Sequence, residues 1–238
     1  MITHKDCWYK NTCNRVGTDL CTAVCPQFYE MSHLLKYSGI PENLHKPIEL
    51  FPESCDISAF KRLAEIKSNI KQEVQNGLNL YIFSHNCGNA KTSWAIKLLQ
   101  SYFHSVSYGN GLKPRGFFIH TPSFFIDRKM TFKDSQADYR LISVKDDMGQ
   151  ELITMPNLLN IDIIVWDEVG VKGMTQFDYL NWLSILDQRI LKGKSNIFTG
   201  NVNREELDQI MGSKLISRIW SSSEIIEFKG RDRRGGNA

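Results

Sequence analysis

Lys91 and Thr92 have the residue types and spacing of a phosphate-binding pair. They lie in the run HNCGNAKTSW, residues 85 to 94, after the apolar stretch LYIFS and at the start of the stretch SWAIKLLQSYF. In a phosphate-binding loop, backbone N–H groups surround the phosphates, a Lys neutralises charge, and the next Ser or Thr holds Mg²⁺ where a helix begins. The run therefore predicts an ATP or ADP site formed by Gly88, Asn89, Ala90, Lys91, Thr92 and Ser93.

Two positions of the run depart from the pattern G-x-x-x-x-G-K-[ST]. His85 and Ala90 occupy the glycine positions. A Cβ at residue 85 penalises a positive φ there, and a methyl at residue 90 crowds the phosphate oxygens. Asn89 is expected to compensate, because Asn tolerates left-handed geometry better than most residues. The alternative is a plain strand, turn and helix with an exposed lysine.

Acidic and amide side chains follow two later apolar stretches. Asp167 and Glu168 end IIVWDEVG, where Asp167 would order the water shell of Mg²⁺ and Glu168 would orient and deprotonate an attacking water. Asn201 ends NIFTGN and could hold the same water from the far side. Alone, the acidic pair is more typical of a helix cap or a solvated turn. Together with the lysine loop, it indicates a phosphoryl-transfer site.

Two arginines further along admit a functional and a structural interpretation. Arg218, in GSKLISRIW, could act as an arginine finger in the site of a neighbouring subunit. Its alternative is a surface salt bridge. For Arg189, in LDQRI, the structural interpretation is a helical residue that is no more than solvated.

Short apolar strands alternating with amphipathic helices must position these groups. This alternation predicts a parallel five-stranded sheet covered on both faces, a three-layer α/β fold. The expected strands are residues 78–84, 115–121, 161–167, 195–201 and 223–229.

Two helices have clear boundaries in the sequence. One begins near Ala59 and is expected to end at Gly77. The other has a capping pair in Thr175 and Asp178 and a stop in Gly193. Its expected core face consists of Phe177, Leu180, Leu183, Leu186 and Ile190.

The bulk composition limits the class of protein. A chain of 238 residues, 42% hydrophobic and 23% charged, can bury a core for one or two domains. A net charge of +3 is too small by itself to indicate nucleic-acid binding. No apolar stretch approaches the roughly 20 residues that span a bilayer. We expect a cytoplasmic protein that does not bind membranes.

Four of the six cysteines lie close together near the N-terminus. They are Cys7, Cys13, Cys21 and Cys25. Four thiolates can form a tetrahedral Zn²⁺ site and so fold a segment too small for its own core, although the paired C-x-x-C spacing is missing. The sequence favours zinc, with four reduced, unliganded thiols as the alternative.

Taken together, these motifs resemble the AAA+ ATPases, and most closely the DnaC/DnaI-type bacterial helicase loaders in their phage or prophage-encoded form. The matching runs are GNAKTSWA, IIVWDEVG, NIFTGN, GSKLISRIW and EFKGRDRR. The resemblance implies a Cys-rich N-terminal domain at 1–36 that docks on the helicase, a linker at 37–56 and an AAA+ domain at 57–238. It also implies a bacterial cytoplasm, Mg²⁺-dependent ATP turnover, homo-oligomers, and loading of the replicative helicase onto single-stranded DNA.

A second DNA-related signal is the run TPSFFIDRKMTFK. Arg128 and Lys129 are candidate contacts to a single strand, because cations can hold its backbone while bases stack on aromatic rings. Phe124 and Phe125 are expected instead to anchor a helix to the sheet.

Two functions follow from the degenerate loop. The first is a helicase loader with slow or partner-stimulated ATPase activity. The second is a catalytically weak or inactive AAA+ adaptor that binds or inhibits the host helicase without turnover.

Overall fold

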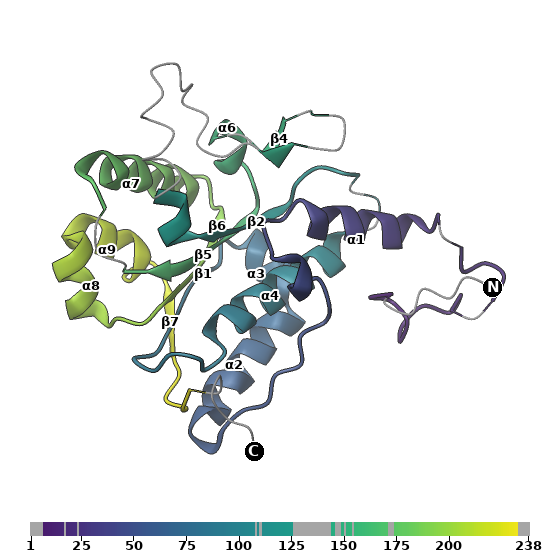
Figure 1. Ribbon diagram of the computed structural model, residues 1–238, viewed down its shortest axis with the longest axis horizontal. Helices are drawn as coiled ribbons and strands as arrows, with labels where there is room; N and C mark the ends of the chain where they lie inside the picture. Colours follow the sequence, from purple (N-terminus) through teal and green to yellow (C-terminus); the bar gives the residue numbers. More distant parts are fainter. Residues whose placement is uncertain are drawn as a thin grey trace.

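The central element of the computed structural model is a five-stranded, wholly parallel β-sheet (Figure 1). The structure describes residues 7–16, 18–22, 24–107, 109, 111–125, 144–145, 149, 151–153, 155–170 and 174–232. In spatial order the strands are β2 (Gly116–His120), β5 (Ile163–Val169), β6 (Ser195–Gly200), β1 (Asn79–Phe83) and β7 (Glu224–Glu227). The predicted five-stranded parallel sheet is confirmed, and each strand begins and ends within two residues of its expected bounds.

Helices connect and cover the strands. They are α1 (Pro26–Lys36), α2 (Ile57–Ser68), α3 (Ile70–Gln75), α4 (Lys91–Val106), α6 (Met155–Leu158), α7 (Gln176–Leu191), α8 (Arg204–Met211) and α9 (Ser213–Ile219). Two short 3₁₀ helices, η1 (Glu42–Leu44) and η2 (Ser54–Asp56), lie in the segment before α2. A separate two-stranded ribbon joins β3 (Val144–Lys145) to β4 (Glu151–Ile153).

The core has two layers because side chains alternate across each strand. In β1, Leu80 and Ile82 belong to the cluster that also holds apolar residues of α1, α2, α3 and α4. Tyr81 and Phe83 point to the other face, into the cluster that contains residues of α7, α8 and α9. Burial on both faces explains why these strands appear in the sequence as nearly continuous apolar runs.

Helix ends follow the expected chemistry with one exception. Thr175 and Asp178 form a capping box at the start of α7, as predicted. Gly77 and Gly193 follow helices in the left-handed conformation that a helix stop favours. The helix expected from Ala59 to Gly77 is instead broken at Asn69 into α2 and α3.

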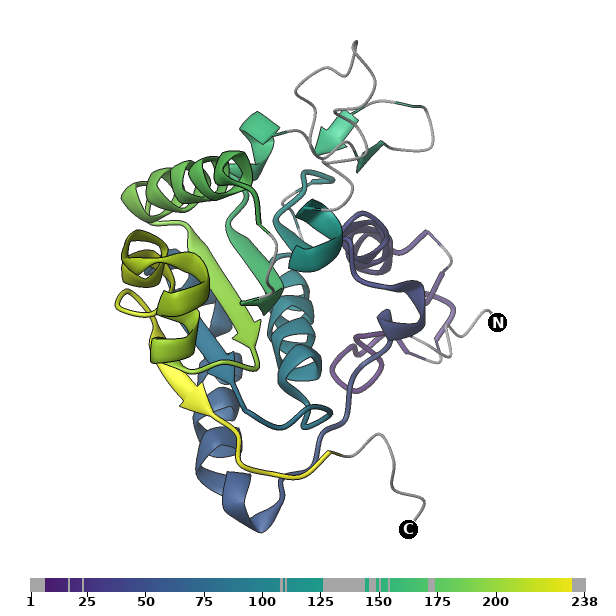
Figure 2. The same cartoon turned by 60° about the vertical axis from the view of Figure 1, so that its left-hand side comes forward.

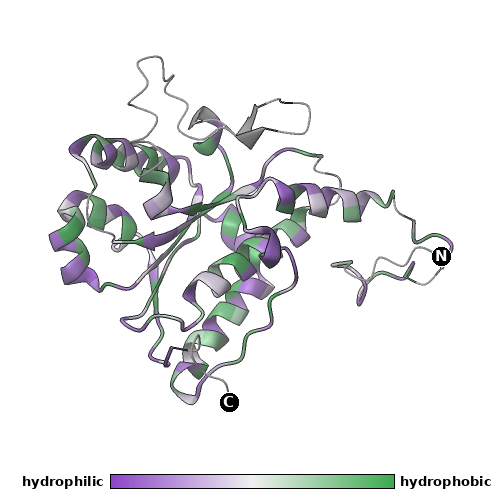
Figure 3. Cartoon of the chain, viewed as in Figure 1, coloured by the Kyte–Doolittle hydropathy of each residue, from purple (hydrophilic) through white to green (hydrophobic). Residues whose placement is uncertain are grey.

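The buried face of α7 differs from the predicted one. Hydrophobic and hydrophilic residues alternate along this helix (Figure 3). Phe177 and Leu180 are 46% and 54% exposed, so their assignment to the core was wrong. The buried residues of α7 are Asp178, Trp182, Ile185, Leu186 and Arg189.

Arg189 is fully buried, so its interpretation as a solvated residue was wrong. Its guanidinium donates to the carbonyl oxygens of Leu158, Ile161 and Ser195 at 2.6 to 2.8 Å. Burial lowers the pKa of Arg189 to about 9, and the charge of Asp162 opposes this effect in part. The arginine therefore joins α7 to the ends of two neighbouring segments by satisfying carbonyls that the core would otherwise leave unpaired.

The N-terminal segment packs on α4, on the side of the molecule away from α7, α8 and α9 (Figure 2). Tyr9 is buried, stacks on the ring of His104 at 4.4 Å and hydrogen-bonds Ser107. The expected division at residues 36 and 56 stays a prediction. Within the described residues, no helix is both long enough and apolar enough to cross a bilayer.

Candidate nucleotide-binding site

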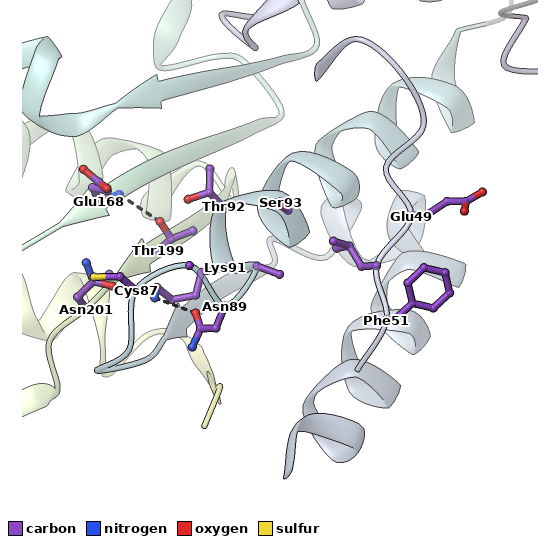
Figure 4. A pocket seen from close by; sticks show the side chains of 14 residues that line it. Glu49, Phe51, Cys87, Asn89, Lys91, Thr92, Ser93, Glu168, Thr199 and Asn201 are labelled. Atoms are coloured by element: carbon purple, nitrogen blue, oxygen red, sulfur yellow. Dashed lines mark hydrogen bonds between the residues drawn. The ribbon is translucent and has the colours of Figure 1, made fainter. Parts of the chain in front are cut away.

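A cavity of about 380 Å³ lies at the carboxyl ends of β1, β5 and β6 (Figure 4). Open parallel sheets bind ligands at this edge, where loops leave successive strands. The cavity brings together eight of the ten residues predicted for nucleotide binding and catalysis, namely Gly88, Asn89, Ala90, Lys91, Thr92, Ser93, Glu168 and Asn201.

The loop after β1 turns through two left-handed residues. These are Gly88, with φ +67°, and Ala90, with φ +74°. Asn89 is not left-handed, so its predicted role in compensating the missing glycines was wrong. His85 does not have a positive φ either, and its imidazole faces Glu206 with Nδ1 3.8 Å from Oε2. Of the two positions where the loop pattern has glycine, only Ala90 therefore has a strained backbone.

Lys91 is held by its own loop. Its side chain is largely buried, and Nζ donates to the carbonyl oxygen of Asn86 at 2.7 Å and to Oδ1 of Asn89 at 3.0 Å. The amide of Asn89 is also buried and donates to the hydroxyl of Ser84. The ammonium thus lies at the cavity wall with neutral oxygen partners, and an entering phosphate would offer it an anionic one.

Asp167 lies at the end of β5 and is almost completely buried. Its Oδ1 accepts hydrogen bonds from Oγ1 of Thr92 at 2.7 Å and from Oγ1 of Thr199 at 2.6 Å. Burial raises the pKa of Asp167, and the two hydroxyl donors partly offset that effect. The contact joins the first turn of α4 to β5, which is the pairing that a shared Mg²⁺ site requires.

Glu168 leaves the sheet at an irregularity in the β5–β6 pairing. The register shifts between Trp166 and Val169, and Glu168 itself has φ +58°, an unusual value for a residue with a side chain. Its backbone N–H donates to Oγ1 of Thr199 at 3.1 Å. Glu168 thereby lines the cavity beside Thr199 (Figure 4).

His120, which no sequence pattern indicated, contacts Glu168. It ends β2 opposite Asp167, and its Nε2 is 3.1 Å from Oε2 of Glu168. Its Nδ1 is 2.8 Å from the hydroxyl of Ser123, which fixes the orientation of the ring. The sequence signal was no more than a polar residue at the end of an apolar strand.

Thr199 and Gly200 were also missed. Thr199 connects Asp167 with the backbone of Glu168, and both missed residues line the cavity. A Cβ at Gly200 would collide with the hydroxyl of Tyr81, so glycine is required there. The signal for Thr199 was a single hydroxyl in the otherwise apolar end of NIFTG.

The segment before α2 forms the opposite wall. Glu49, Leu50 and Phe51 line the cavity, and Phe51 is 72% exposed (Figure 4). These residues could not be assigned to the site from the sequence, because the linker has no periodic pattern that indicates where it packs.

Arg218 lies outside the cavity. It belongs to α9, and its Nε donates to Oδ1 of Asp187 on α7 at 2.5 Å. Within one chain Arg218 therefore forms a salt bridge, which was the alternative to its role as an arginine finger. It does not line the nucleotide cavity of its own chain.

The four N-terminal cysteines line one cavity of about 320 Å³ but do not converge. Cys7, Cys13, Cys21 and Cys25 are each half-buried, with free thiols. Among the described residues, no three His, Cys, Asp or Glu side chains are placed to hold a metal. The arrangement does not fit the predicted closed zinc site.

The predicted DNA contacts Arg128 and Lys129 lie outside the described residues. Phe124 and Phe125, just before them, are buried among apolar residues of β5 and α7, so their predicted anchoring role is confirmed.

Comparison with known proteins gives structural likenesses only. The chain matches no known protein-family profile and no curated protein sequence. A crystal structure of the DnaC helicase loader is 17% identical with a TM-score of 0.56, over 76% of this chain and 94% of that one. A crystal structure of DnaI is 15% identical with a TM-score of 0.53, over 82% and 93%.

A third solved structure is the replication initiator DnaA bound to AMPPCP and single-stranded DNA. It is 16% identical with a TM-score of 0.53, over 82% of this chain and 50% of that one. Identities this low establish a shared fold and no more. The chain shares with these proteins an α/β fold built on a five-stranded parallel sheet.

Proposed function

We propose that this chain binds ATP or ADP with Mg²⁺ and acts in DNA replication as an ATP-dependent loader of the replicative helicase onto single-stranded DNA. One observation carries the proposal. The loop containing Lys91, the bulge containing Glu168 and the strand end at Asn201 converge on one cavity at the carboxyl edge of the sheet. Nothing in a solvated turn or a helix cap requires that convergence.

Each side chain has a role that its position supports. Lys91 would exchange its carbonyl partners for phosphate oxygens, with the N–H groups at the start of α4 beside it. Thr92 and Asp167 would hold Mg²⁺, because their oxygens are 2.7 Å apart and hard oxygen ligands are those that Mg²⁺ prefers. When bound, the metal supplies positive charge to the phosphate oxygens.

Glu168 and Asn201 would hold the attacking water between them. Glu168 is the candidate general base, and its contact with His120 fixes the carboxylate in one orientation until substrate enters. Arg218, which lies outside the cavity of its own chain, would act in a neighbouring subunit of a homo-oligomer.

The partners are proposed from the fold and the sequence together. The DnaC structure is that of a helicase loader, and the DnaA structure contains AMPPCP and single-stranded DNA. These likenesses support a replicative helicase and single-stranded DNA as partners here. Arg128 and Lys129 stay proposed DNA contacts, and a phage or prophage origin stays a sequence-based expectation.

Steady-state ATP hydrolysis, measured with single-stranded DNA and the replicative helicase present, tests the loader function. Glu168→Gln should abolish hydrolysis and keep ATP binding, because it removes the base and leaves the phosphate-binding loop unchanged. Glu205→Gln is the matched control, since Glu205 lies exposed on α8 and does not line the cavity. Loading without any hydrolysis, under every combination of partners, would contradict this function.

A second candidate is the adaptor that binds or inhibits a helicase without turnover. It is favoured by the oxygen partners that Lys91 already has and by the left-handed Ala90 methyl beside the cavity. Under this alternative ATP binds as a structural ligand or not at all, and Glu168→Gln has no effect on helicase inhibition.

Zinc at the N-terminal cysteines is a separate proposal that rests on the sequence. The four cysteines line one cavity, although among the described residues their thiols are not placed to hold a metal. Metal analysis of protein purified without added zinc tests it, and a content well below one zinc per chain would exclude the site.

A further inference from the structure

A second large cavity, of about 780 Å³, opens beside α4. Four separate segments line it. They are the N-terminal segment at Lys10, the linker at Glu49, the α2–α3 junction around Asn69, and one side of α4 from Lys97 to Ser105. Figure 1 shows α2, α3 and α4 adjacent in this part of the fold.

The charge of this cavity is strongly one-sided. Its lysines are Lys10, Lys67, Lys71 and Lys97, and we call it the lysine cavity. Among the described residues that line it, Glu49 is the one carboxylate. Within the described part of the chain, Lys10, Lys67 and Lys71 are all exposed, and no ion pair neutralises them.

The lysines lie close enough to affect each other and a nearby histidine. Burial lowers the pKa of Lys97, and the charge of Lys67 lowers it further, with Glu49 opposing. Burial also lowers the pKa of His104, and Lys67 again adds to the effect. Folding therefore concentrates positive charge here at an electrostatic cost, which a bound anion would relieve.

The remaining lining favours a phosphate-bearing strand over a peptide. The apolar side chains at its surface are few, namely Trp8, Pro47 and Ile48, and they do not form the continuous apolar stripe that an amphipathic helix needs. Trp8 is half-buried at its wall and offers an indole ring to a base. A cationic channel with an aromatic ring is the combination that binds single strands without sequence preference.

We infer that the lysine cavity binds the phosphodiester backbone of single-stranded nucleic acid. The inference rests on the proposed function for the biological role of that strand. Strand binding by the lysine cavity requires no ATP in the nucleotide site, so the inference and the proposed function can fail independently. It places a strand next to the ATP cavity, because Glu49 lines both and Lys97 follows Ser93 by one helical turn. It also uses a surface far in sequence from Arg128 and Lys129.

The test is fluorescence anisotropy with a labelled oligothymidylate, measured without nucleotide at several salt concentrations. In the full chain, Lys67→Gln/Lys71→Gln removes two cations from the cavity. Each phosphate contact to a single strand contributes about 0.7 to the slope of log affinity against log salt, so the slope should fall by about 1.4.

The matched control is Lys61→Gln/Lys214→Gln, which removes the same charge at two exposed positions that line none of the cavities described above. Its slope should equal that of the wild type. An unchanged slope for the cavity variant, or an equal fall for the control, would overturn the inference.

Two further measurements distinguish the lysine cavity from the nucleotide site and nucleic acid from an acidic polypeptide. Lys91→Ala should bind the oligonucleotide as the wild type does, whether or not it still binds ATP. Polyglutamate of equal charge should compete poorly. Loss of oligonucleotide binding in Lys91→Ala would overturn the inference in favour of the nucleotide site, and full competition by polyglutamate would overturn it in favour of an acidic polypeptide ligand.

Discussion

The backbone strain at Ala90 gives a quantitative test of the phosphate loop. Ala90 precedes α4 with φ +74° and ψ +11°, in the left-handed region. An alanine there costs about 1–2 kcal/mol relative to the right-handed conformation, whereas glycine adopts it freely. Ala90→Gly should therefore remove strain from the folded state.

Two effects oppose the gain. Glycine loses conformational entropy on folding that costs about 0.5–1 kcal/mol more than for alanine. Removing the half-buried Ala90 methyl also loses part of the ~0.8 kcal/mol that a fully buried methyl group contributes. The terms nearly cancel, so Ala90→Gly should lie within about 0.5 kcal/mol of the wild type in free energy of unfolding.

The matched control is Ala64→Gly, at an exposed position inside α2. There glycine relieves nothing and should cost about 1 kcal/mol. Urea and thermal unfolding should thus rank Ala90→Gly above Ala64→Gly by about 1 kcal/mol, or roughly 2–4 °C. Equal destabilisation by the two variants would refute the strained geometry. If the methyl also crowds the phosphates, Ala90→Gly should bind ATP more tightly.

Three further predictions concern buried and contacting polar groups. Arg189→Met should lower the free energy of unfolding by about 3 kcal/mol or more, because buried carbonyls lose their donor; an unchanged urea midpoint would contradict this. Burial raises the pKa of the Asp167 carboxyl above its ordinary value of 3.8. The protonated carboxyl therefore stabilises the folded state, fully so below pH 3.8, and this stabilisation is lost as the pH rises through the pKa of the folded protein. Asp167→Asn should therefore melt higher than the wild type at pH 7, with a gap that narrows towards pH 4, while Mg²⁺-dependent ATP binding is lost. His120→Ala frees the Glu168 carboxylate and should raise the ATP turnover rate without changing ATP affinity; an equal change in both would assign His120 a merely structural role.

The sheet could be predicted well from the sequence because local patterns encode it. Five apolar runs separated by helices sufficed for strand positions, and the capping pair of Thr175 and Asp178 marked the start of α7. The pattern failed within α7, where hydrophobic periodicity selected Phe177 while the true buried face includes Arg189. A buried arginine is invisible to hydrophobic periodicity, since its stability depends on carbonyls from distant segments.

The candidate site was predictable only in part. Lys91, Thr92, Asp167 and Glu168 were indicated by residue type and spacing. His120 could not be predicted, because its contact with Glu168 depends on the register of β2 against β5. The linker residues Glu49, Leu50 and Phe51 could not be predicted either, because they reach the cavity through contacts between segments that are distant in the sequence.

Phosphate binding by the loop of Lys91 is the central claim, and calorimetry with ATP or ADP plus Mg²⁺ tests it most directly. The wild type should bind both nucleotides. Lys91→Ala, checked for folding by circular dichroism, should bind ATP about ten- to a hundredfold more weakly, the usual cost of a lost charged hydrogen bond. Lys192→Ala, at an exposed position outside the cavity, should bind as the wild type does. Failure of the wild type to bind either nucleotide at millimolar concentration, or equal binding by Lys91→Ala, would contradict the claim.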